Sequence, residues 1–110
     1  MKIIKTIKEF EQLKKQEDIL LTYFSHDRCN VCKVLLPKVK DLVNKDFPRV
    51  NLAHCNTEHA PELAAQNSIF TAPAIIIFVQ GKEYKRISRN IGLMELAQYI
   101  SRPYQMVFED

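Results

Sequence analysis

The stretch of sequence that decides the fold reads Ile19-Leu20-Leu21-Thr22-Tyr23-Phe24-Ser25-His26-Asp27-Arg28-Cys29-Asn30-Val31-Cys32. Its first part, Ile19–Phe24, is an apolar run that contains β-formers and is too short for a helix of ordinary length, so it predicts a buried strand. A polar loop follows, and helical periodicity begins at about Asn30. The two cysteines therefore lie where a buried strand gives way to a helix.

This position favours the thiolate form of Cys29. The free amides and the dipole of a helix N-terminus stabilise an anion by about 0.3–2 kcal/mol, which lowers the pKa of a thiol from about 8.5 by up to about one and a half units. Arg28 favours the thiolate further, whereas Asp27 opposes it. Cys32, one turn later, is expected to face Cys29 from a shielded position. The pattern predicts a reactive dithiol.

Two other interpretations of the cysteine pair are weaker. A structural zinc site needs four ligands; His26, His54, Cys55 and His59 are available, but their spacing matches no zinc motif, and we expect no metal. A purely structural disulfide would close so short a loop that it would stabilise the fold by only about 2 kcal/mol. Redox exchange explains both the identity and the position of the pair.

The remaining periodicity predicts the element order α-β-α-β-α-β-β-α. The first helix begins with a capping box, Thr6 to Glu9, and reaches about Gln16. The helix from Asn30 contains Pro37, is ended by Phe47-Pro48, and is expected to turn a set of apolar residues inward: Val31, Val34, Leu35, Val39, Leu42 and Val43. The later elements are a strand Val50–Cys55, a helix Glu62–Asn67 preceded by Pro61, a central strand Ala74–Val79, a charged edge strand Glu83–Ser88, and a helix that Arg102-Pro103 stops.

Composition narrows the class of protein. The 110 residues predict a single domain, 1–110, with 46% hydrophobic and 26% charged residues, which is ordinary for a globular chain. A net charge of +3 and only 2 glycines argue against nucleic acid as a partner and against a glycine-rich phosphate loop. We expect no signal peptide and no membrane segment. Three cysteines, one adjacent pair and one single, are typical of a reducing compartment, so a cytoplasmic location is expected.

These residues together resemble the thioredoxin family over nearly the whole chain. The resemblance rests on the strand Ile19–Phe24, the motif Cys29-Asn30-Val31-Cys32-Lys33, Pro37 within the following helix, and Thr71-Ala72-Pro73 just before Ala74–Val79. The spacing of about forty residues between the cysteine motif and the proline loop also fits. The resemblance implies an α/β fold: a three-layer α/β/α sandwich with a central mixed four-stranded sheet.

The resemblance also implies roles for particular residues. Cys29 would be the attacking thiolate and Cys32 the resolving thiol. Pro73 would follow a cis peptide bond beside the cysteines, leaving the backbone of Ala72 free to pair with an extended substrate. Arg28 replaces the usual tryptophan before the first cysteine, and Arg89 replaces a glycine of the substrate groove, which implies a narrower and more cationic groove.

Two further family positions concern proton transfer. The family's buried acid aligns near Thr22, which does not titrate, and the lysine that often accompanies that acid aligns near His54. His54 is therefore a candidate proton relay, with a structural histidine as the alternative. Cys55 is expected to be a buried, inert thiol. Tyr23, Phe24, Phe70 and Phe78 are expected in the core.

The implied function is a thiol–disulfide oxidoreductase that reduces or exchanges protein disulfides through Cys29 and Cys32. It would need no bound cofactor, would act on disulfide-containing proteins or low-molecular-weight thiols, and would take electrons from a separate reductase. The alternative is a binding, adaptor or redox-sensing module on the same fold with little turnover. We expect a monomer, although the apolar residues Tyr104, Met106, Val107 and Phe108 after Pro103 either fold back on the body or join a dimer.

Overall fold

The computed structural model describes residues 1–109, in which strands and helices alternate except for two consecutive strands in the second half of the chain. The first half of the chain comprises β1 (Lys2–Ile3), α1 (Ile7–Gln16), β2 (Ile19–Ser25), α2 (Asn30–Asp46) and β3 (Asn51–Asn56). The second half comprises α3 (Pro61–Gln66), β4 (Ala74–Val79), β5 (Lys82–Ser88) and α4 (Leu93–Phe108). The predicted strands and helices are all present, with ends that differ by a residue or two except at α4.

The strands form one mixed sheet in the order β1-β3-β2-β4-β5. β1, β3 and β2 run parallel, whereas β4 and β5 are antiparallel to their neighbours. The sheet has five strands instead of the predicted four, because Lys2 and Ile3 pair with Ala53 and His54 at one edge. A two-residue strand is too short to show alternation in the sequence.

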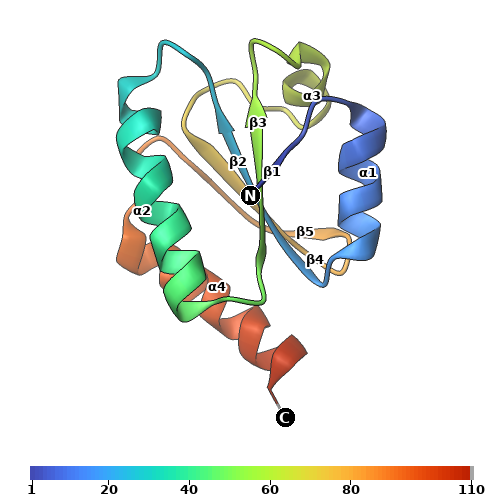
Figure 1. Ribbon diagram of the computed structural model, residues 1–110, viewed down its shortest axis with the longest axis vertical. Coiled ribbons are helices and arrows are strands. Elements are labelled where there is room, and N and C mark those ends of the chain that lie inside the picture. The colour runs from blue at the N-terminus through green and yellow to red at the C-terminus, as the bar shows by residue number, and fades with distance from the viewer. Residues whose placement is uncertain (110) are drawn as a thin grey trace.

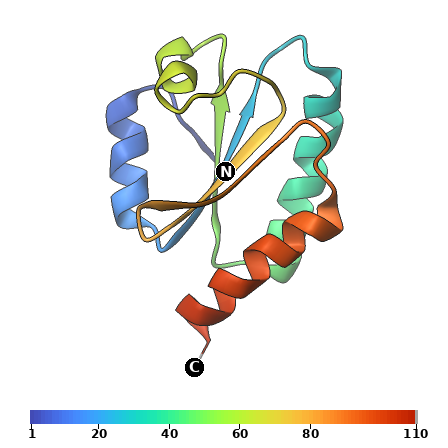
Figure 2. The same cartoon turned by 180° about the vertical axis from the view of Figure 1, so that it is seen from behind.

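Helices cover both faces of the sheet (Figures 1 and 2): α2 and α4 lie on one face, and α1 and α3 on the other. All seven residues of β2 are buried, as its apolar sequence predicted for a central strand. Alternate residues of β2 contribute to two separate cores. Ile19, Leu21 and Tyr23 pack on the α2 and α4 side, and Leu20 and Phe24 on the other. This is the three-layer α/β arrangement expected from the sequence.

Helix α1 is capped as predicted: the Thr6 hydroxyl accepts a hydrogen bond from the Glu9 amide at 3.1 Å, and the Glu9 carboxylate accepts one from the Thr6 amide at 3.1 Å. The prediction for α2 was wrong at two positions. Val31 and Val34 are each 61% exposed instead of facing inward, because the first turns of α2 bury only one narrow stripe, at Cys32 and Leu35.

The prediction that the last helix stops at Arg102-Pro103 was also wrong. Helix α4 continues through Pro103 to Phe108, and Pro103 itself is buried. The ring of Tyr104 lies 5.3 Å from that of Phe47 and 4.9 Å from that of Phe108, and the guanidinium of Arg49 lies 4.2 Å from the Phe108 ring. These contacts compensate for the hydrogen bond that proline removes. The apolar tail therefore folds back on the body.

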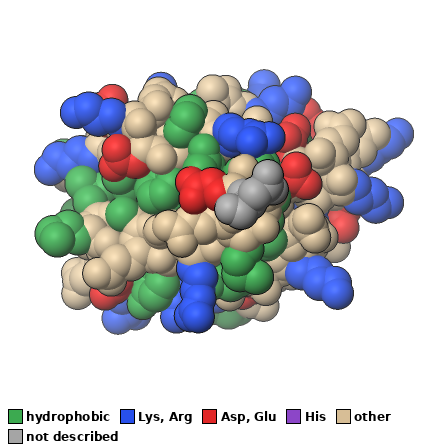
Figure 3. Space-filling view, turned by 90° about the horizontal axis from the view of Figure 1, so that it is seen from below, with side chains coloured by type: hydrophobic (Ala, Val, Ile, Leu, Met, Phe, Trp, Pro, Cys, Tyr) green, Lys and Arg blue, Asp and Glu red, His purple; other side chains and the backbone are tan. Residues whose placement is uncertain are grey.

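At the end of the molecule where α4 finishes, Lys and Arg side chains alternate with Asp and Glu around the rim and do not form one patch (Figure 3). Among residues 1–109, no helix is long and apolar enough to span a bilayer.

The contacts of the tail predict its contribution to stability. Replacing Tyr104 with Ala removes both ring contacts and should lower the free energy of unfolding by about 2 kcal/mol. Met106, on the same helix but 78% exposed, is the matched control, and Met106→Ala should change stability by less than about 0.5 kcal/mol. Urea denaturation measures both variants; equal stabilities would show that the tail does not support the core.

Candidate active site

Cys29 occupies the N-cap of α2, the position predicted for a reactive thiol. Its Sγ accepts a hydrogen bond from the Cys32 amide at 3.1 Å, so the sulfur partners one of the free amides at the helix N-terminus. Cys29 is partly exposed, whereas Cys32 is 2% exposed and packs in the core on the α2 face. The two sulfurs form a disulfide, with a Cα–Cα separation of 5.2 Å. One sulfur is accessible and the other is shielded.

Strand register brings two other loops to the cysteines. β2 and β4 are antiparallel, with Phe24 opposite Ala74, so the segment just before β4 lies beside the end of β2. That segment contains the Ala72–Pro73 peptide bond, which is cis. Ala74 in turn pairs with Ser88, which places Arg89 beside the same edge. A surface groove here is lined by His26, Cys29, Asn30, Val31, Ala72, Pro73, Arg89 and Asn90.

The predicted substrate residues lie at this groove in different ways. Ala72, Pro73 and Arg89 line it with Cys29. Arg89 adopts a left-handed backbone with φ of 67°, a conformation that favours glycine, and its amide donates to the carbonyl of Pro73 at 3.0 Å. Arg28 is 83% exposed and points toward Glu58, 3.8 Å away, and it is not among the residues that line the groove.

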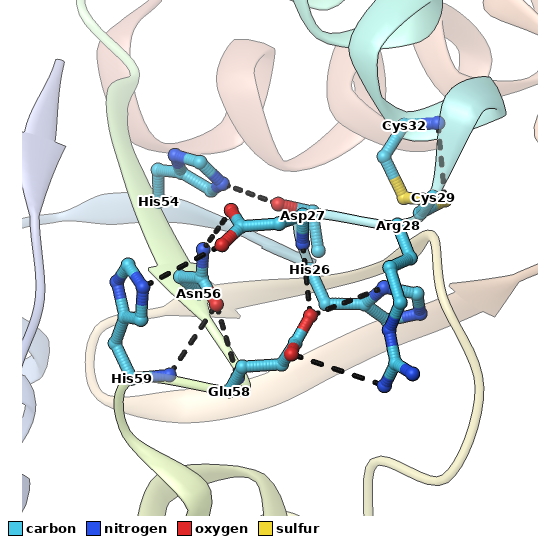
Figure 4. A network of polar contacts seen from close by, with 10 residues as sticks. His26, Asp27, Arg28, Cys29, Cys32, His54, Asn56, Glu58 and His59 are labelled. Carbon is cyan, nitrogen blue, oxygen red and sulfur yellow. Dashed lines mark hydrogen bonds and ion pairs between the residues drawn. A yellow bond between two sulfur atoms is a disulfide. The ribbon is translucent and has the colours of Figure 1, made fainter.

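A network of charged and polar side chains surrounds the loop before Cys29 (Figure 4). Asp27 accepts a hydrogen bond from the Asn56 amide nitrogen at 2.9 Å and lies 3.6 Å from Nε2 of His59. Glu58 accepts a hydrogen bond from the Asp27 amide at 3.1 Å, and the same carboxylate lies 3.7 Å from Nδ1 of His26. Asp27, the acidic residue near Cys29 in the sequence, is therefore held by Asn56 and His59.

Behind Cys32 lies a second, buried cluster. The hydroxyl of Tyr23 donates to the Cys32 carbonyl at 2.9 Å, and the Tyr23 ring lies 5.8 Å from the His54 ring. His54 Nε2 in turn lies 2.5 Å from the hydroxyl oxygen of Ser25. Burial raises the pKa of Tyr23 to about 12 and lowers the pKa of His54. Tyr23 is therefore neutral near pH 7, and burial opposes a charge on His54.

The alignment of the family's acid with Thr22 was wrong. Strand alternation places Thr22 on the α1 and α3 side, away from the cysteines, and its hydroxyl oxygen is buried without a hydrogen-bond partner. Tyr23 is the residue on the Cys32 side. A shift of one position in a strand exchanges the two faces of the sheet, which explains the error.

The burial of Cys55 and of Phe70 was also predicted from the sequence. Cys55 is fully buried on the α1 and α3 side, as predicted, and burial raises the pKa of its thiol to about 11. Phe70 was expected in the core but is 86% exposed. Within residues 1–109, no three His, Cys, Asp or Glu side chains lie close enough together to hold a metal ion.

In the sequence, His26 stood out only as a possible zinc ligand, and no pattern pointed to Glu58. The parallel register of β2 and β3, with Ser25 opposite Asn56, brings Glu58 to the loop before Cys29. This contact joins residues far apart in the sequence, so no local pattern reveals it. The nearness of His26 to Cys29 along the chain was the available signal.

Comparisons with known proteins agree with this geometry. Residues 2–102 match the sequence model described as Thioredoxin. The chain belongs to the thioredoxin family. It is 32% identical to "Thioredoxin-like protein YdfQ" of Bacillus subtilis over 87% of this chain and 85% of that protein. It is 31% identical to the thioredoxin of Peptoclostridium acidaminophilum over 77% of this chain and 76% of that one.

Solved structures show the same thioredoxin fold. A mutant thioredoxin from Halobacterium salinarum superposes with a TM-score of 0.87 at 19% identity, covering 96% of this chain and 92% of that one. Oxidised mitochondrial thioredoxin 3 from Saccharomyces cerevisiae gives a TM-score of 0.83 at 23% identity, covering 92% and 93%. Family membership and the close cysteine pair support thiol–disulfide oxidoreductase chemistry in general.

The lowered pKa of His54 predicts a pH dependence of stability. The unfolded chain binds a proton at this histidine below about pH 6.5, while the folded chain binds it only at lower pH, so stability should fall as the pH drops below about 6.5. His54→Gln should reduce this slope, measured as the free energy of unfolding between pH 7.5 and 5.5. An unchanged slope in the His54 variant would contradict the assignment.

The environment of Cys55 predicts selective labelling. With the disulfide reduced, iodoacetamide at pH 8 should modify Cys29 readily, whereas a thiol pKa of about 11 lowers the thiolate fraction of Cys55 about a hundredfold and burial shields its sulfur. Peptide mapping by mass spectrometry distinguishes the two sites. Cys55 should be modified only after denaturation; rapid labelling in the folded protein would refute its inert role.

Proposed function

We propose that this thioredoxin-family chain is a thiol–disulfide oxidoreductase that reduces protein disulfides through Cys29 and Cys32. One observation carries the proposal: the partly exposed sulfur of Cys29 caps α2 in the groove that also contains Ala72 and Pro73, with the sulfur of Cys32 shielded directly behind it. This arrangement separates an attacking sulfur from a resolving sulfur. In addition, the Ala72 backbone at the groove is suited to pairing with an extended substrate segment.

In the first step, the Cys29 thiolate attacks one sulfur of a substrate disulfide. A bond forms between Cys29 Sγ and that sulfur, the substrate S–S bond breaks, and the second substrate sulfur leaves as a thiolate that takes up a proton. The amide of Cys32, which donates to Cys29 Sγ, stabilises the negative charge before the attack. This is the contribution of the helix N-terminus to the reaction.

In the second step, Cys32 loses its proton and attacks Cys29 Sγ. The mixed disulfide breaks, the substrate leaves as a reduced thiol, and the Cys29–Cys32 disulfide forms. Two electrons pass from the cysteine pair to the substrate, and a thiol donor such as a separate reductase restores the dithiol. His54 is the proposed proton relay for this step; it contacts the hydroxyl of Ser25 and lies beside the Tyr23 ring, on the Cys32 side of the sheet. In a reducing compartment such as the cytoplasm, the net direction is reduction.

Single-cysteine variants test the proposal. Cys29→Ser should abolish reduction of a protein disulfide, and Cys32→Ser should stop the reaction at a stable mixed disulfide on Cys29. Cys55→Ser is the matched control and should keep nearly full turnover, because Cys55 lies on the opposite side of the sheet. Turnover is followed with a dithiol donor, and the trapped species is identified by mass spectrometry.

The same experiments distinguish a catalytic oxidoreductase from a redox-sensing module. Full turnover by the Cys29 variant would refute the mechanism. A cysteine pair that equilibrates reversibly with a glutathione buffer but supports no turnover on protein disulfides would instead favour a redox-sensing module. That alternative draws on Arg28, which stands where the family has a tryptophan beside the attacking cysteine.

A further inference from the structure

His26 lines the same groove as Cys29, Ala72 and Pro73, although it belongs to the loop before α2. Its carbonyl accepts a hydrogen bond from the Cys29 amide at 3.2 Å, so its backbone is fixed relative to the attacking cysteine. The side chain is 32% exposed. A histidine is therefore built into the wall of the groove where a substrate disulfide would lie.

The two nitrogens of the His26 ring have different surroundings. Nδ1 is buried, has no hydrogen-bond partner, and lies 3.7 Å from a carboxylate oxygen of Glu58. When the ring carries two protons, the proton on Nδ1 faces Glu58, and Nε2 is the nitrogen left to reach a molecule in the groove. Glu58 is itself held by the Asp27 amide, so its position does not depend on His26.

The charged groups around His26 come from three segments. Glu58 approaches from the turn after β3, while Arg28 and Asp27 lie on the loop of His26 itself. Arg89 lines the groove from the loop after β5. Asp27 is engaged with Asn56 and His59, which leaves Glu58 as the acid facing the ring.

We propose that His26 is a catalytic residue that protonates the leaving sulfur in the first exchange step, an inference that rests on the proposed function. The Cys29 thiolate attacks the near sulfur of the substrate, the substrate S–S bond breaks, and the proton on Nε2 passes to the departing thiolate. The products are the mixed disulfide on Cys29, a neutral thiol and a neutral imidazole, so charge and atoms balance. Glu58 positions the ring and acts only through it.

The test compares two leaving groups on one peptide. The cysteine of an extended peptide is joined by a disulfide either to nitrothiobenzoate, which leaves as a stabilised aromatic thiolate, or to 2-mercaptoethanol, an aliphatic thiol of much higher pKa that benefits from a proton. The Cys32→Ser background stops the reaction after the first step. Mass spectrometry measures the rate at which the Cys29–peptide disulfide forms, and the readout is the ratio of the aromatic to the aliphatic rate.

This ratio isolates the role of His26. Both rates are proportional to the fraction of Cys29 that is present as thiolate, so that fraction cancels in the ratio. His26→Gln should raise the ratio by about tenfold or more, since the loss of general acid catalysis slows only the aliphatic reaction. His59→Gln is the matched control: His59 belongs to the same polar network but is 69% exposed and does not line the groove, so the ratio should not change.

A pH series on the Cys32→Ser chain alone provides a second measurement that needs no change at His26. The ratio should rise from pH 5.5 to pH 8, because general acid catalysis of the aliphatic reaction weakens as protons become scarcer, and it should be flat in the His26→Gln variant if that variant folds. A ratio that does not depend on pH, or that is unchanged by His26→Gln, would overturn the proposal while leaving the proposed function intact. If neither peptide reacts with Cys29, both proposals fail.

Discussion

The placement of one sulfur atom, that of Cys29 at the N-cap of α2, is the constraint on which the rest of the site depends. The sulfur is held there because β2 is buried on both faces and cannot slide, and because the Cys32 amide needs an acceptor at the helix end. The other components then follow from strand pairing. Antiparallel pairing to β4 brings Pro73 to the cysteines, and parallel pairing to β3 brings Glu58.

The sequence predicts well what depends on periodicity and spacing. The apolar runs of β2 and β4, the capping box of α1 and the start of α2 at Cys29 were all identified from local pattern. The sequence predicts poorly which side of a helix is buried and which residues far apart in the chain contact each other. Val31 and Val34 have helical spacing and apolar side chains, but the face of α2 that packs on the sheet contains Cys32 and Leu35 instead. The extension of α4 beyond Pro103 likewise depends on Phe47 and Arg49, far away in the sequence.

The largest gap between sequence and structure lies in the side-chain network at the site. Aligning Thr22 in place of Tyr23 is an error of one residue, yet it moves the side chain through the sheet from one core to the other. The pairing of His26 with Glu58 requires the register of β2 against β3, which no single segment encodes. Fold and reaction class are thus readable from the chain, whereas the groups that handle protons emerge only from tertiary contacts.

The groups around Cys32 determine how protons are handled behind the cysteine pair. The residue behind Cys32 is Tyr23, whose raised pKa keeps it protonated and whose proton is already donated to the Cys32 carbonyl. His54 has a pKa lowered by burial, so it can accept a proton only transiently near neutral pH. The core side of the cysteine pair is therefore electrically neutral. On the other side of the pair, His26 and Arg89 line the groove where a departing substrate sulfur would emerge, and the Glu58 carboxylate lies 3.7 Å from the His26 ring. The groups behind Cys32 are neutral, whereas polar and charged side chains line the groove in front of Cys29. The proton for the departing substrate sulfur would therefore come from the surface that contacts the substrate.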